Sequence, residues 1–149
     1  MGTKELENLV RIGRLHQQPP DRTFVRKLLD AARRTLADAG NESLSPETRF
    51  DAAYNAAFRA ALAALAANGF RPATSTPGHH QTTIQSLVHT IDYPRESMVI
   101  LDAIRQRRNG IDYSGDIVSE EMVRECIEQS TLLVASVDAW IAENRKELV

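Results

Sequence analysis

The stretch SPETRFDAAYNAAFRAALAALAANG, at residues 45–69, decides the fold class. Ser45 suits a helix N-cap, where its hydroxyl accepts a free backbone amide, and Pro46 suits the first helical position. Asn68 and Gly69 then supply a helix end. Apolar residues recur between these signals at helical spacing: Phe50, Tyr54, Ala57, Phe58, Ala61, Leu62 and Leu65. The many alanines would let neighbouring helices approach closely, so we expect this helix at the centre of a helical bundle.

The rest of the chain has the same helical periodicity and no convincing strand pattern. Proline ends the helices where they should end, as in QQPP at residues 17–20 and DYP at residues 92–94. We therefore expect an all-α fold, an antiparallel bundle of about five to six helices in a single domain over residues 1–149. The other helices are expected at about residues 4–16, 21–39, 79–91, from 94 onward, and 119–146, with Phe24 and Ile100 among the inward apolar positions.

Charge and cysteine content narrow the class of partner. A net charge of -2 and a pI near 6.1 create no global field that would draw the chain onto nucleic acid or an anionic membrane, so any such contact must be local. Cys126 is the only cysteine, which excludes an internal disulfide and suits a reducing compartment. The charged first residues do not resemble a signal peptide, and no run reaches the roughly 20 apolar residues of a membrane span. We expect a soluble cytoplasmic protein without membrane contact.

Positive charge collects on one helix face in AIRQRRNGIDYSG, residues 103–115. Met98, Leu101, Arg105 and Arg108 step by three, four and three, so both arginines continue the apolar face. A charged group on an inner face is costly unless it is paired, exposed or used. The arginines could extend into solvent at the bundle end, meet acids of a neighbouring helix or subunit, or bind a phosphate. Base rates for arginine favour the first two placements.

A family resemblance adds to this pattern. The segment RRNGIDY, residues 107–113, resembles the motif of HEPN-family helical bundles, in which an arginine, often followed by asparagine, precedes a histidine by a few residues near a helix end. Two earlier segments, RFDAAYNAAFRAALAALAANGFRP at residues 49–72 and GHHQTTIQSL at residues 78–87, are similar to a core helix, loop and next helix of small bacterial HEPN-like proteins. The resemblance covers under half of the chain.

The resemblance implies a dimer in which the arginine motifs of two subunits face one cleft. Many HEPN proteins are metal-independent endoribonucleases, often toxins that a nucleotidyltransferase-like antitoxin holds in check. Others bind nucleotides or serve as partner modules for nucleotidyltransferases. We therefore expect a homodimer that binds RNA or a nucleotide phosphate. If the chain is an enzyme, we expect a metal-independent ribonuclease of the toxin-antitoxin type. The alternative is a non-catalytic partner or substrate-binding module for a nucleotidyltransferase-like protein.

The resemblance assigns Arg108 to the phosphate, with Arg105 beside it and Asn109 as its orienting neighbour. Tyr113 stands five residues after Arg108, where the family has histidine. A phenol with an ordinary pKa near 10 is a poor base at neutral pH, although it can donate a hydrogen bond to phosphate or ribose. The motif thus favours phosphate binding over catalysis. Asn109 and Gly110 have an equally good structural interpretation as a helix stop.

His79 and His80 are the second place to find a base. They lie at the expected start of the fourth helix, where free backbone amides attract anions. If this region folds toward Arg108, one histidine could transfer the proton that Tyr113 cannot. The alternative is an exposed pair that only caps the helix. No cysteine cluster, glycine-rich phosphate loop or dinucleotide-binding fingerprint accompanies these residues, so we expect neither a metal site nor a cofactor.

Overall fold

A computed structural model describes residues 2–115 and 117–149, with the side chains of residues 112–114 outside the description. These described residues form seven α-helices, one short 3-10 helix and a two-stranded sheet. The all-α fold class that the periodicity predicts is therefore confirmed. Within the described ranges, no helix is both long enough and apolar enough to cross a membrane.

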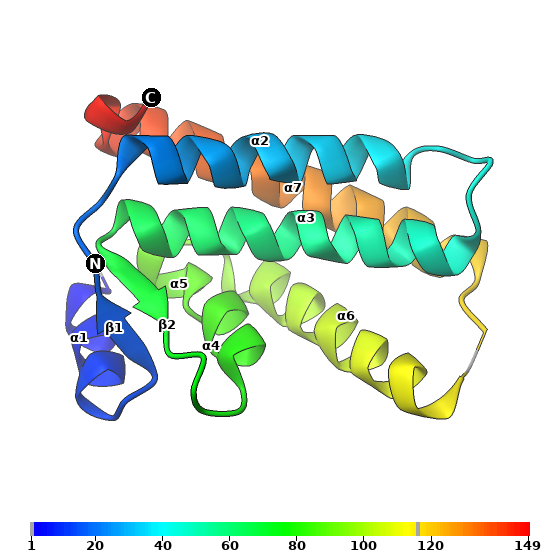
Figure 1. Cartoon of the computed structure of the whole chain (residues 1–149), viewed down its shortest axis with the longest axis horizontal. Coiled ribbons are helices and arrows are strands. Elements are labelled where there is room, and N and C mark those ends of the chain that lie inside the picture. Colours follow the sequence, from blue (N-terminus) through cyan, green and yellow to red (C-terminus); the bar gives the residue numbers. More distant parts are fainter. Residues whose placement is uncertain (1, 116) are drawn as a thin grey trace.

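Three long helices form the main body: α2 (Arg22–Ala39), α3 (Pro46–Ala67) and α7 (Glu120–Asn144). They lie side by side, and α3 packs against both of the others (Figure 1). The close approach is possible because α3 buries mostly alanine, whose small side chain lets two backbones draw near. The prediction of α3 as the central helix is confirmed.

The ends of α3 follow from local chemistry. The Ser45 hydroxyl accepts the backbone N–H of Thr48 at 3.2 Å, Pro46 occupies the first helical position, and Asn68 caps the C-terminus. Arg49, in the first turn, is 7% exposed and donates from Nε to the backbone carbonyl of Ala39 at 2.8 Å. That bond satisfies one of the free carbonyls at the end of α2 and ties α2 to α3.

The helix predicted at residues 79–91 is two shorter helices, α4 (His79–Gln85) and α5 (Leu87–Thr90). They meet at Ser86, whose buried hydroxyl donates to the carbonyl of Thr82 at 2.6 Å. A serine that bonds back to its own helix in this way favours a bend. The next helix, α6 (Arg95–Ser114), begins after Pro94 and runs obliquely beneath α3 (Figure 1).

The N-terminal region differs most from the prediction. Helix α1 (Thr3–Arg11) is shorter than expected, and Gly13 turns the chain with a φ of 81°. The chain then forms β1 (Leu15–Gln17), which pairs antiparallel with β2 (Phe70–Pro72), so the expectation of no strand was wrong. Strands of three residues are too short to show an alternating pattern, and their pairing spans more than 50 residues of sequence. At the other end, η1 (Lys146–Leu148) packs on α2 and α7.

Two apolar residues predicted to face inward do not. Phe24 is 39% exposed because α2 turns Val25 and Leu29 toward the core instead. Ile100 is 38% exposed and lies beside Val99, which is 55% exposed, on the outer face of α6. These two residues of α6 form an apolar surface on the described chain.

Candidate phosphate-binding pocket

The start of α4 and the second half of α6 enclose a pocket of about 190 Å³. His79 and His80 line it from α4, and Arg105, Arg108 and Asn109 line it from α6. The sequence predicted that these five residues would lie together only if the histidine region folds toward the arginines. The structure brings all five to one place.

The helical spacing of α6 explains why its arginines reach the pocket. Met98 and Leu101 are buried in the core, and Arg105 and Arg108 continue the same face toward the helix end. The side chain of Arg105 is 12% exposed and that of Arg108 is 24% exposed. Both guanidinium groups are therefore largely removed from water and need partners.

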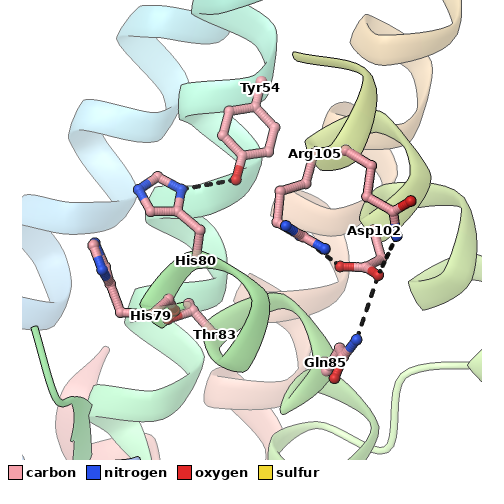
Figure 2. A network of polar contacts seen from close by, with 8 residues as sticks. Tyr54, His79, His80, Thr83, Gln85, Asp102 and Arg105 are labelled. Carbon is pink, nitrogen blue, oxygen red and sulfur yellow. Dashed lines mark hydrogen bonds and ion pairs between the residues drawn. The ribbon is translucent and has the colours of Figure 1, made fainter. Parts of the chain in front are cut away.

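Asp102 is the partner that holds Arg105. Arg105 donates from Nε to Asp102 Oδ1 at 2.7 Å, and the second carboxylate oxygen accepts from Gln106 at 3.2 Å and from Gln85 at 3.4 Å (Figure 2). Burial alone would raise the pKa of this carboxyl, but the hydrogen bond and charge of Arg105, with the two glutamine bonds, lower it below its ordinary value. Asp102 is thus an ionised anchor at neutral pH.

Arg108 is held from α3. It donates from Nε to Asp51 Oδ1 at 2.8 Å, and its Cζ lies 5.1 Å from the centre of the Tyr54 ring. Guanidinium over an aromatic face is favourable, and the ring limits where the side chain can move. Both pocket arginines thus use Nε for a carboxylate. Among the described side chains, no hydrogen bond occupies the Nη nitrogens of either one.

His80 contacts two aromatic rings of α3, those of Phe58 and Tyr54. Its imidazole stacks on Phe58, with centroids 3.9 Å apart and 9° between the planes. The Tyr54 hydroxyl lies 2.9 Å from Nδ1 of the same ring (Figure 2). The His79 and His80 rings pack edge to face, with their centroids 4.7 Å apart, so aromatic contact continues to the pocket wall.

The protonation states of this pair follow from their surroundings. Burial raises the pKa of Tyr54 to about 12, so the phenol keeps its proton. Burial, the neighbouring His79 and the positive charges of Arg108 and Arg105 lower the pKa of His80 to about 4, so its imidazole is neutral. Tyr54 is 1% exposed and its O–H needs an acceptor, which assigns the donor role to Tyr54 and the acceptor role to Nδ1. The hydrogen of His80 is then on Nε2.

The pocket consequently offers hydrogen-bond donors. Two guanidinium groups present Nη nitrogens, and the neutral His80 ring forms part of the pocket wall. Such a set matches the oxygens of a phosphate, which accept bonds in several directions. Within the described part of the chain, no three histidine, cysteine, aspartate or glutamate side chains gather as metal ligands would.

The end of the arginine motif lies in the last turns of α6. The side chain of Tyr113 lies outside the described residues. Asn109 and Gly110 lie inside α6, which continues to Ser114 and ends at Gly115 with a φ of 71°. The interpretation of Asn109 and Gly110 as a helix stop was therefore wrong, because the left-handed end occurs five residues later.

Four residues at the pocket were missed as functional candidates. Tyr54 and Phe58 were assigned only to the apolar stripe of α3, and neither Asp51 nor Asp102 was considered. Asp102 had a signal in the sequence, because an acid three residues before Arg105 lies on the same helix face. Asp51 had none, since its pairing with Arg108 joins two separate helices.

Comparison with known proteins leaves the chain unassigned. No protein-family model matches it, and no curated protein sequence matches it.

Proposed function

We propose that this chain is a HEPN-like domain that binds RNA or a nucleotide phosphate in the pocket between α4 and α6. Arg105 and Arg108 contact the phosphate oxygens through Nη, and the His80 ring forms part of the pocket wall. Asn109 and His79 complete the rim, where they meet the ribose or the base. The observation that carries the proposal is the convergence of these five side chains on one small pocket.

The same geometry favours binding over cleavage. A base that activates a ribose hydroxyl needs a free lone pair directed at the substrate. In His80 the lone pair of Nδ1 accepts from Tyr54, and Nε2 carries a hydrogen. Metal-independent ribonuclease activity of the toxin type would therefore require Tyr113 or a residue of a second subunit to take the proton.

Dimerisation and partner binding belong to the same proposal. Val99 and Ile100 expose apolar surface on the side of α6 away from the core, close in sequence to the arginine face. A second copy packed on this surface would place two α6 helices side by side. In the alternative function, a nucleotidyltransferase-like protein covers this surface and the chain acts as a non-catalytic module.

RNA binding tests the main proposal directly. Fluorescence anisotropy with a labelled single-stranded RNA should show binding that Arg108→Ala weakens by about tenfold or more, because a charge-assisted contact is lost. Arg107→Ala is the matched control. It removes the same charge one position away, from an exposed residue outside the pocket. Equal losses in both variants would show that only net charge attracts RNA and would refute the pocket.

Cleavage and assembly separate the two candidate functions. Mixed RNA incubated with the protein and a chelator should remain intact if the chain only binds. Cleavage that persists in chelator and disappears in Arg108→Ala would establish the ribonuclease. Analytical ultracentrifugation of wild type and Ile100→Glu tests the dimer, since a charge on this surface should favour the monomer. A monomeric wild type would favour the partner module.

A further inference from the structure

Burial and neighbouring charges both oppose the protonation of His80, the histidine of the pocket that Tyr54 contacts. The Tyr54 hydroxyl, the Phe58 ring and the pocket occupy three sides of His80. Positive charge faces it from α6, and His79 lies on its own helix. The titratable and charged groups around His80 are Asp51 and Tyr54 of α3, His79 of α4, and Asp102, Arg105 and Arg108 of α6.

The formal charges of the two ion pairs at the pocket cancel. Arg105 is paired with Asp102, and Arg108 is paired with Asp51. With both histidines neutral, these two pairs leave no formal net charge. A bound oxyanion would therefore bring negative charge that the pairs do not neutralise. It would offset the positive charges of Arg108 and Arg105, which add to burial and to His79 in keeping His80 unprotonated.

We infer that the pocket takes up a phosphate group together with one proton, which binds to Nδ1 of His80. The resulting imidazolium donates Nδ1–H to the hydroxyl oxygen of Tyr54, and its positive charge attracts the phosphate. The proton comes from solvent, and no bond to phosphorus forms or breaks. This inference rests on the proposed function, because it concerns the same pocket.

Tyr54 makes this change possible without a rearrangement of the rings. A phenol hydroxyl can donate one hydrogen bond and accept others. When Nδ1–H donates to Tyr54, the phenol hydrogen must turn about the C–O bond to another acceptor, because this O–H is buried. The 2.9 Å separation from Nδ1 suits both directions of the bond. Phe58, stacked at 3.9 Å, holds the imidazole plane in place in both states.

The linkage has a definite sign. If the pKa of His80 is higher in the complex than in the free chain, binding takes up a proton between the two values. Affinity then rises as pH falls through the pKa of the complex, and it levels off below the free value of about 4. Sulfate is a suitable probe because it remains doubly charged across this range, so any pH dependence belongs to the protein.

Two measurements test the coupling on the intact chain. NMR titration of the imidazole signals, with His80 assigned by its loss in His80→Gln, should show its pKa raised by about one or more in saturating sulfate. For a pKa raised from about 4 to about 5, sulfate affinity at constant ionic strength should be about fivefold tighter at pH 4 than at pH 7 and approach tenfold only at lower pH. His16→Gln, at an exposed histidine of β1 outside the pocket, is the control and should keep this pH dependence, whereas His80→Gln should lose it.

The outcomes distinguish this inference from the proposed function. Sulfate binding that depends on Arg108 but is equal at both pH values, with an unmoved His80 signal, would overturn the proton coupling alone. Failure of the wild type to bind either sulfate or RNA would overturn the proposed function. If His80→Gln keeps the pH dependence and has wild-type circular dichroism, another group takes up the proton, and the role of His80 is overturned.

Discussion

Replacing Asp102 with asparagine tests the anchor beneath the pocket. All three side chains that contact this carboxylate, Arg105, Gln85 and Gln106, are donors. An asparagine keeps one accepting oxygen but points an NH2 group at a donor in place of the other. The substitution also leaves the Arg105 guanidinium, only 12% exposed, without its counter-charge.

The expected loss is about 2 to 3 kcal/mol in the free energy of unfolding. A hydrogen bond to a charged group is worth roughly 1.5 to 3 kcal/mol, and the unpaired NH2 adds to its loss. Breaking a fully buried pair costs about 3 to 5 kcal/mol, which sets an upper limit because this site is partly hydrated. Urea denaturation followed by circular dichroism at pH 7 measures the difference.

The chain contains a matched control for this substitution. Asp30 and Arg33 form a pair of the same spacing on α2, but their side chains are 55% and 40% exposed, and Arg33 also pairs with Asp138. Asp30→Asn should therefore cost less than about 0.5 kcal/mol. An Asp102→Asn variant as stable as Asp30→Asn would refute the idea that the carboxylate is an anchor.

The pH dependence of the Asp102 contribution has a required direction. The pKa of its carboxyl is lowered in the folded chain, so its stabilisation is present above the ordinary value and disappears as pH falls through the folded value. The stability difference between wild type and Asp102→Asn should therefore shrink in acid. A difference that stays constant from neutral pH to pH 2 would contradict this assignment.

Substitutions at three further positions test hydrogen bonds in the bundle, each by urea denaturation. Ser45→Ala should cost about 1 kcal/mol because the amide of Thr48 loses its cap, while Ser45→Thr should restore most of the loss. Ser130→Ala should cost about 1 kcal/mol, since it removes a buried 2.7 Å hydrogen bond to the carbonyl of Ala53, and no loss would show that this bond is dispensable. Thr90→Val should raise stability by about 1 kcal/mol, because the described residues offer its buried hydroxyl no partner; a lower stability would reveal one.

The sequence alone predicted the features that depend on neighbouring residues. The cap at Ser45, the proline that follows it and the alanine-rich face of α3 are local, so the fold class and the central helix could be read from them. The placement of Arg105 and Arg108 on the inner face of α6 is also local, since it follows from a spacing of three.

The contacts that make the pocket are non-local. Arg108 meets Asp51 across 57 residues, and His80 meets Tyr54 across 26. No periodicity encodes such a distance, because it depends on how α4, α6 and α3 pack. The strand pair β1 and β2 escaped prediction for the same reason.

The sequence by itself thus determined an all-α chain with two arginines on an inward face and two adjacent histidines. Only the tertiary structure decided that these groups share one pocket, that carboxylates hold both arginines by Nε, and that His80 is neutral. The physical reason is that hydrogen bonds, burial and electrostatic fields act through space. A histidine that is ordinary in the sequence becomes neutral once burial beside two aromatic rings and the charges of His79 and two arginines oppose its protonation.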